Sequence, residues 1–126
     1  MKAILFRQHG GPDKLSYEDL PTPVIGPDEV LIKVKACALN HLDIWIRQGN
    51  PAYPMPLPHV SGSDVAGVVE QVGAQADHVT VGQRVFVSPG ISCWKCESCL
   101  AGRDNFCRNV KQAVDRAQVL LKSRPA

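Results

Sequence analysis

Four cysteines in one short stretch carry the clearest chemistry in this sequence. Cys93, Cys96 and Cys99 recur at every third residue, and Cys107 follows eight positions later, beyond the turn-forming Gly102. The short spacing lets one knuckle of backbone direct three sulfurs at a common point, and the longer segment lets the fourth close a tetrahedron. Four thiolates without a fifth donor form a structural zinc site, which keeps no coordination position open for a reactant. The sequence therefore predicts a structural Zn²⁺ bound by these four residues, in a lobe spanning residues 91–109.

Two other roles for the cysteines were weighed against zinc. A disulfide framework suits an even set of cysteines in a secreted chain, but this chain has five cysteines and no apolar secretory signal at its start. An iron–sulfur cluster is the closer alternative, because bacterial ferredoxins also begin with C-x2-C-x2-C. Those sequences place the fourth cysteine after three residues and follow it with proline. Here seven residues separate Cys99 from Cys107, and Arg108 follows, so the spacing favours zinc over an iron–sulfur electron carrier.

Length and composition indicate one globular domain. The chain has 126 residues, of which 44% are hydrophobic and 21% charged, which is ordinary for a folded domain. Fourteen Lys and Arg against twelve Asp and Glu give a net charge of +2, and no basic run exceeds two residues, so nucleic acid is not expected as a partner. No apolar run is long enough for a membrane span. We expect a cytoplasmic, reducing location, which also keeps thiolates available for metal.

Short strands punctuated by glycine and proline dominate the expected secondary structure. Strands are expected over 2–7, 15–20, 29–38, 64–72 and 83–88. In the strand over 29–38, Val30, Ile32, Val34 and Ala36 alternate with lysines and should share the buried face. Residues 40–48 predict a short helix, with Asn40 as its N-cap and Gly49 as its end. The pattern predicts a mainly β fold, a small and partly open barrel or sandwich, from which the cysteine lobe projects.

Three longer segments resemble a known family. EVLIKVKACALNHLDIWIRQG, PLPHVSGSDVAGVVEQVG and VGQRVFVSPGISCWKCESCLAGRDNFC look like the medium-chain zinc-type alcohol dehydrogenase and quinone oxidoreductase superfamily. The resemblance covers roughly the first 110 residues and implies the N-terminal, GroES-like catalytic domain over 1–109, with the four cysteines at the structural-zinc positions. In whole members of the family, this domain packs against a Rossmann domain that binds NAD(H) or NADP(H). The substrates implied are alcohols, aldehydes or quinone-like molecules.

The catalytic-zinc positions depart from the alcohol dehydrogenase pattern. The ligand cysteine position falls on Asn40, the proton-relay hydroxyl on Leu42 and the ligand histidine on Ser63. A carboxamide and a serine are poor zinc ligands, so the chain looks like the quinone-oxidoreductase branch, which transfers hydride without a catalytic metal. The resemblance makes Asn40, Asp43 and Asp64 the candidate catalytic residues. It also makes His41 a candidate contact to the cofactor phosphates, although Asn40 could simply cap the helix and His41 could simply lie on the surface.

Three further residues near these positions have simpler expected roles. Cys37 is expected to be a small buried side chain rather than a ligand of a second metal. Ile44 and Trp45, on the short helix, are expected to pack into the core. A second zinc assembled from Cys37 and its histidine and carboxylate neighbours is therefore disfavoured.

Two features limit what the chain is expected to do alone. No G-x-G-x-x-G loop or βαβ unit is visible, so we expect NAD(P) to bind only where a cofactor domain is present, and the isolated chain to be inactive. Residues 110–126 place apolar side chains at helical spacing, which predicts a C-terminal amphipathic helix that covers the open barrel or favours a homodimer. A truncated, non-catalytic zinc-binding product stays open as an alternative.

Overall fold

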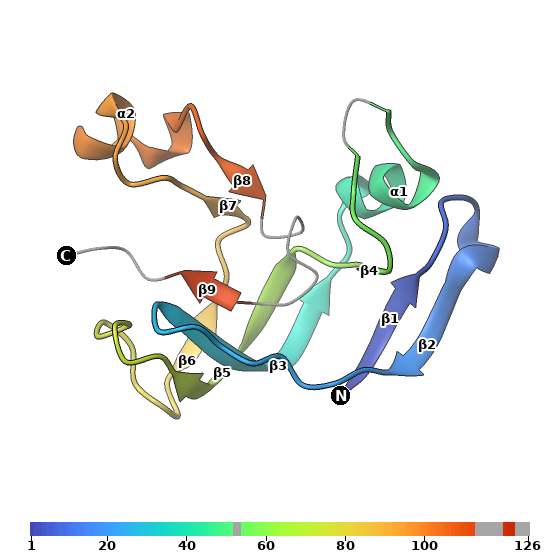
Figure 1. Cartoon of the computed structure of the whole chain (residues 1–126), viewed down its shortest axis with the longest axis horizontal. Coiled ribbons are helices and arrows are strands. Elements are labelled where there is room, and N and C mark those ends of the chain that lie inside the picture. The colour runs from blue at the N-terminus through green and yellow to red at the C-terminus, as the bar shows by residue number, and fades with distance from the viewer. Residues whose placement is uncertain (52–53, 113–119, 123–126) are drawn as a thin grey trace.

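The computed structural model describes residues 1–51, 54–112 and 120–122 (Figure 1). The elements, in chain order, are β1 (Lys2–Phe6), η1 (Pro12–Lys14), β2 (Leu15–Asp19), β3 (Glu29–Ala38), α1 (His41–Gln48), β4 (His59–Val60), β5 (Asp64–Val72), β6 (Arg84–Phe86), β7 (Gly90–Ile91), α2 (Glu97–Leu100), η2 (Asp104–Phe106), β8 (Lys111–Gln112) and β9 (Leu120–Lys122). Helices are few and short, as the mainly β prediction requires.

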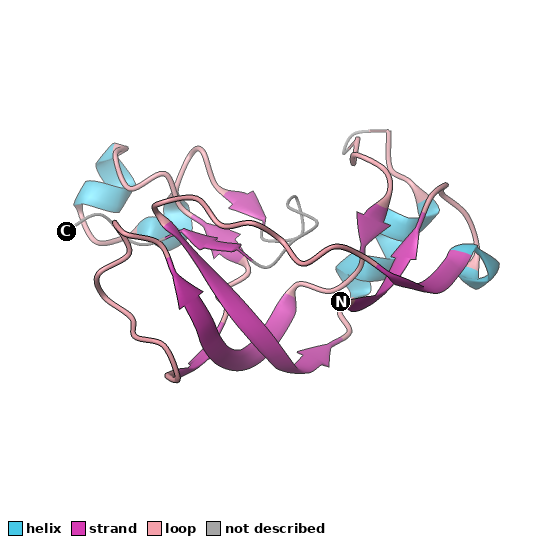
Figure 2. Ribbon diagram, turned by 60° about the horizontal axis from the view of Figure 1, so that its bottom comes forward, coloured by secondary structure: helices cyan, strands magenta, loops and turns pink. Residues whose placement is uncertain are grey.

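The strands form three antiparallel sheets within the described part of the chain. Their strand orders are β2-β1-β4, β6-β5-β3-β9 and β7-β8, and the long β3–β5 pair forms the centre of the largest sheet. Figure 2 shows helical turns at opposite ends of the molecule, with the long strands between them. No sheet closes on itself among the described residues, which confirms the prediction of a mainly β, partly open fold.

The main core lies on one face of the β3–β5 pair. Its buried members are Val30, Ile32, Val65, Val69, Ala76 and Val87. A smaller cluster joins Phe6 of β1 to Ile46 of α1, so the helix is held against the first sheet by apolar contact. Each buried aliphatic or aromatic side chain of this kind contributes about 1.5–3 kcal/mol to folding, so both clusters fix the elements that carry the polar groups described below.

The predicted alternation along β3 does not appear in the burial of its residues. Val30, Leu31 and Ile32 are all buried, whereas the residues from Lys33 to Ala38 are all exposed, Val34 at 46%. Successive residues of a strand point to opposite faces, so the first part of β3 is buried on both faces and the second part on neither. Burial here depends on what packs against each part of the strand, and a simple period of two fails.

The predicted C-terminal helix is not what the described residues of that segment form. Lys111–Gln112 is strand β8, paired with β7, and Leu120–Lys122 is strand β9, paired with Glu29–Leu31 of β3. Residues 113–119 and 123–126, which the predicted helix also included, lie outside the described residues. The start of β3 offers unpaired backbone N–H and C=O groups along an edge. The hydrogen bonds that Leu120–Lys122 gains by pairing with that edge favour a strand over the helix that the spacing of the apolar residues predicted.

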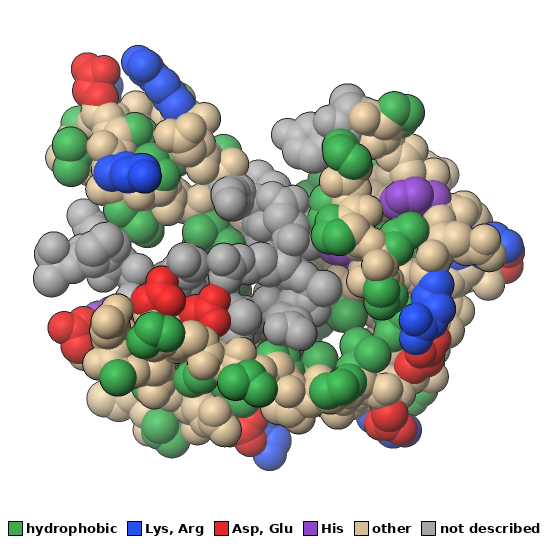
Figure 3. All heavy atoms as spheres, viewed as in Figure 1, with side chains coloured by type: hydrophobic (Ala, Val, Ile, Leu, Met, Phe, Trp, Pro, Cys, Tyr) green, Lys and Arg blue, Asp and Glu red, His purple; other side chains and the backbone are tan. Residues whose placement is uncertain are grey.

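Several large apolar side chains lie at the surface. Leu39 is 88% exposed, Phe86 82%, and Trp45 and Ile44 of α1 are 56% and 42% exposed, so the prediction that Ile44 and Trp45 pack into the core is wrong. Figure 3 shows hydrophobic side chains reaching the visible surface beside charges of both signs. None of the helices in the described part of the chain is long and apolar enough to span a membrane.

Candidate functional site

The cysteine lobe is an excursion between two short paired strands. Strand β7 leads into it and β8 leads out, with Gly90 opposite Gln112 and Ile91 opposite Lys111. Inside the lobe, Gly102 has a φ of 72°, in the left-handed region that suits glycine, and its N–H donates to the Cys99 carbonyl at 3.0 Å. This turn reverses the chain after α2 and directs Cys107 back towards the other cysteines.

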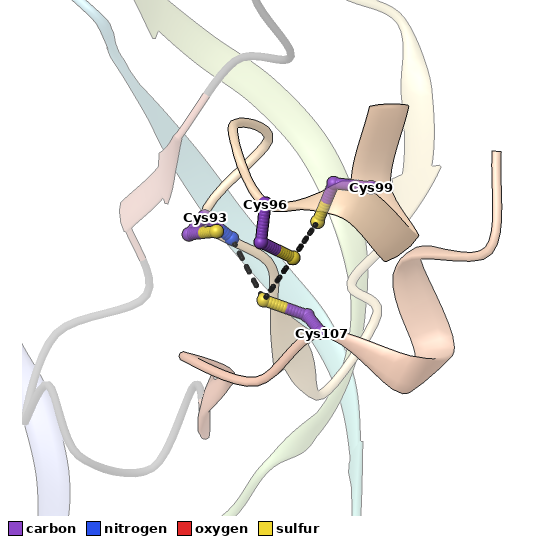
Figure 4. Close-up of side chains that lie close together, drawn as sticks. All are labelled: Cys93, Cys96, Cys99 and Cys107. Carbon is purple, nitrogen blue, oxygen red and sulfur yellow. Dashed lines mark hydrogen bonds between the residues drawn. The ribbon is translucent and has the colours of Figure 1, made fainter. Parts of the chain in front are cut away.

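The four cysteine side chains meet at one point, as predicted (Figure 4). The sulfurs of Cys93, Cys96, Cys99 and Cys107 all lie within 4.8 Å of one another. Cys96 Sγ is 3.5 Å from Cys99 Sγ and 4.0 Å from Cys107 Sγ. A tetrahedral zinc with Zn–S bonds of about 2.3 Å needs sulfurs about 3.8 Å apart. The donor set therefore fits one Zn²⁺ in both chemistry and spacing.

The same spacing bears on the two alternatives to zinc. All five cysteines are free thiols, so no disulfide framework forms among them. In the [4Fe–4S] cluster that a ferredoxin-like spacing suggests, each thiolate binds a different iron atom, which spreads the sulfurs apart. Four sulfurs gathered within 4.8 Å suit a single ion better than a cluster.

Amide N–H groups of the lobe point at the sulfurs. The Cys93 N–H donates to Cys107 Sγ at 3.3 Å, and the Asn109 backbone N–H donates to the same sulfur at 3.4 Å. The side-chain amide of Asn109 donates to Cys93 Sγ at 3.8 Å. Hydrogen bonds to a thiolate stabilise its charged form, so these bonds favour sulfur anions at the two cysteines that accept them.

The cysteine pKa values differ within the lobe. The backbone amide of Lys95, helped by hydrogen bonds from Cys107, Cys96 and Asn109, lowers the pKa of Cys93 to about 6. Backbone amides of Cys99 and Arg108 lower the pKa of Cys96, whereas burial raises the pKa of Cys99 to about 12. Without a metal, Cys93 is mostly a thiolate at neutral pH and Cys99 keeps its proton, so a bound cation must displace that proton.

A second polar cluster lies at the N-terminus of α1. Asn40 caps the helix, as predicted, because its side-chain oxygen accepts from the Leu42 N–H at 3.2 Å. Asp43 completes the capping box by accepting from the Asn40 backbone N–H at 2.7 Å, and its other carboxylate oxygen accepts from the Gly62 N–H at 2.9 Å. Asp43 is only 8% exposed. It therefore ties the start of α1 to the loop that precedes β5.

The structure brings the three candidate catalytic residues together. Asn40 Nδ2 donates to Asp64 Oδ2 at 3.4 Å, and the Asn40 backbone N–H donates to Asp43, so Asn40 links the two carboxylates. Cys37 is exposed, so the prediction of a buried side chain is wrong. The sulfur itself is partly shielded from water, and this desolvation, together with the nearby charges of Asp43 and Asp64, raises the pKa of the Cys37 thiol, which disfavours a thiolate ligand at this position.

The candidate cofactor residue lies beside an aromatic ring. His41 is exposed on the first turn of α1 and meets Trp45 edge-on, with ring centroids 5.0 Å apart. A cavity of about 410 Å³ begins at Trp45 and is lined by Trp45, Gln48, Gly49, Asn50 and Pro51.

The sequence profile of the alcohol dehydrogenase GroES-like domain matches residues 26–119. The chain belongs to the alcohol dehydrogenase GroES-like domain family. The match ends ten residues past 109, and the domain boundary at 109 stays a prediction.

Individual relatives support this family assignment. The chain is 34% identical over 110 residues to an alcohol dehydrogenase of Schizosaccharomyces pombe, covering 86% of this chain and 31% of the relative. It is 41% identical over 102 residues to the quinone oxidoreductase of Homo sapiens, covering 80% and 31%. The crystal structure of an NAD-dependent alcohol dehydrogenase superposes with a TM-score of 0.86 at 43% identity, over 97% of this chain and 37% of that one. The GroES-like chain thus spans about a third of the length of these relatives.

Proposed function

We propose that this chain is the GroES-like, substrate-binding portion of an NAD(P)-dependent oxidoreductase that acts on alcohols, aldehydes or quinone-like molecules. The observation that carries the proposal is the joining of Asn40, Asp43 and Asp64 into one hydrogen-bonded cluster at the start of α1. Relatives that the chain resembles include an alcohol dehydrogenase, sorbitol dehydrogenases and quinone oxidoreductases.

The proposed reaction does not use a catalytic zinc. Zinc in a catalytic site takes three protein ligands from Cys, His, Asp or Glu. Among the described residues, the only group with metal-ligand geometry is the four-cysteine lobe. At the α1 cluster the hydrogen-bonded polar groups are the Asn40 carboxamide and the carboxylates of Asp43 and Asp64, which already accept N–H groups, and the thiol of the nearby Cys37 has a raised pKa. This donor set fits substrate hydrogen bonding better than metal binding.

Each residue of the cluster has a proposed role. Asn40 and Asp64 present an amide and a carboxylate to the substrate or the nicotinamide, and Asp43 positions them by fixing the helix to the loop. His41, exposed on the same turn, contacts the cofactor phosphates. When a cofactor domain is present, the nicotinamide would accept a hydride from an alcohol in its oxidised form or donate one to an aldehyde or quinone in its reduced form, and this chain contributes orientation and electrostatics around the reacting atoms.

The zinc in this proposal is structural. Cys93, Cys96, Cys99 and Cys107 bind one Zn²⁺ that stabilises the lobe and contacts no reactant. Classical small zinc lobes are too short to fold by burial of apolar surface alone. A reducing, cytoplasmic location would keep the four thiols available for metal. No nucleic acid or membrane partner is proposed, and a homodimer stays a prediction.

Metal analysis and turnover assays test these proposals together. The purified chain should be colourless and contain one zinc per chain, and it should oxidise no NAD(P)H with quinones or aldehydes on its own. Two zincs per chain would contradict the absence of a catalytic metal, and bound iron with a brown colour would contradict the zinc lobe.

The substrate-binding role needs the cofactor domain for its test. In a protein that joins this chain to a cofactor domain, Asn40→Ala and Asp64→Ala should each lower kcat, whereas Cys99→Ser should lower metal content and stability. If the joined protein binds zinc but reduces no substrate, the truncated, non-catalytic zinc-binding alternative is favoured instead.

A further inference from the structure

Asn109 contacts the cysteine cluster without being one of its ligands. It lies two residues after Cys107, and its backbone N–H donates to Cys107 Sγ at 3.4 Å while its side-chain Nδ2 donates to Cys93 Sγ at 3.8 Å. Cys93 opens the lobe and Cys107 closes it, so one residue bridges the first and the last sulfur.

Asn109 differs from the backbone donors of the lobe because it also donates a hydrogen bond through its side chain. The backbone amides of Cys93, Lys95 and Arg108 also donate to cluster sulfurs, but side-chain substitution leaves backbone amides in place. The Asn109 carboxamide, in contrast, donates to a cluster sulfur from a side chain that substitution can remove. It also contributes to the lowered pKa of Cys93.

We infer that Asn109 is a positioning residue of the metal centre, which orients Cys93 and Cys107 and stabilises their negative charge. The inference rests on the proposed zinc site. Four thiolates on one divalent ion carry a net charge of −2. Neutral N–H donors disperse that charge while all four thiolates stay bound to the ion. Groups that hydrogen-bond metal ligands typically raise metal affinity 10- to 100-fold. Because the contact of Asn109 is long, we expect the lower end of that range.

Two substitutions and a matched control test the inference. Asn109→Ala removes the donor and keeps the backbone amide, so zinc should bind about tenfold more weakly. Asn109→Asp replaces the donor by an anion of the same shape beside a thiolate, so the loss should be larger than for Ala. Asn105→Asp makes the same charge change at an exposed position of the same lobe, and its zinc affinity should stay within about threefold of the unmodified chain.

The measurements need no enzyme activity. Zinc affinity is measured on the full chain by competition with a chromophoric chelator, and Co²⁺ is substituted to record the sulfur-to-metal charge-transfer band. Loss of a hydrogen bond raises the electron density on sulfur, so this band should move to lower energy in Asn109→Ala and stay unchanged in Asn105→Asp. A role in folding alone would weaken binding without moving the band.

The outcomes separate this inference from the proposed function. If the unmodified chain binds no zinc, the proposed zinc site and this inference both fail. If it binds one zinc and both Asn109 variants match Asn105→Asp in affinity and spectrum, only the role of Asn109 is refuted. If Asn109→Asp alone weakens binding, the effect is one of charge and the positioning role is refuted as well.

Discussion

Replacing Asp43 by Asn should destabilise the chain by about 2 kcal/mol. The carboxylate is 8% exposed and accepts two backbone N–H groups, from Asn40 at 2.7 Å and from Gly62 at 2.9 Å. Hydrogen bonds to a charged acceptor contribute about 1.5–3 kcal/mol each. Asn keeps one acceptor oxygen but turns an NH₂ group towards the other N–H, so roughly one bond is lost. Asp43→Ala removes both acceptors and should cost about 3 kcal/mol or more.

Urea unfolding followed by circular dichroism measures this loss. With an m-value of about 2 kcal/mol per M, the midpoint for Asp43→Asn should fall by about 1 M. Asp77→Asn is the matched control, because its side chain is 84% exposed, and its midpoint should stay within about 0.25 M of the unmodified chain. A midpoint for Asp43→Asn equal to that of the control would refute the view that Asp43 joins α1 to the 61–64 loop.

Two further outcomes are expected. Gly62→Ala should destabilise the chain by about 2 kcal/mol in urea unfolding, because Gly62 has a φ of 108° and its added Cβ would lie 2.7 Å from Cys37 Sγ. Adding Cys37→Ala removes the contact with sulfur and should restore part of the lost stability. Full restoration would show that backbone strain is unimportant. Zinc binding at pH 7.5 should release fewer than four protons, because the lowered pKa of Cys93, about 6, means that this thiol has already lost its proton, whereas Cys99, with a pKa raised to about 12, still carries one. Zinc affinity should fall as pH falls, since protons compete with zinc for the thiolates. Calorimetry in buffers of different ionisation enthalpy counts these protons, and release of four would contradict the lowered pKa of Cys93.

Features set by near neighbours in the sequence were predictable. The spacing of Cys93 to Cys107 identified the cluster, because the turns that gather the sulfurs lie between them. Asn40 and Gly49 identified the ends of α1 for the same reason, since capping is a contact within a few residues. In both cases the residues in contact are close together in the sequence.

Features that depend on distant pairing were not predictable. The bond from Gly62 to Asp43 joins residues 19 positions apart, so the positioning role of Asp43 needed the structure. Val34 and Ala36 are exposed while Val30, Leu31 and Ile32 are all buried, because burial along β3 depends on which distant segments pack against each part of the strand. Leu120–Lys122 carried a helical pattern, yet pairs with the start of β3, because an open edge about 90 residues earlier competes for its backbone groups.

The pairing of Gly90 with Gln112 and of Ile91 with Lys111 places the entrance and the exit of the cysteine lobe side by side. A segment whose two ends already touch can be shortened, exchanged or removed by a short reconnecting turn, with little demand on the strands beneath it. The metal-bearing segment is in this sense a module, free to change over evolution independently of the sheet that carries the polar cluster of α1.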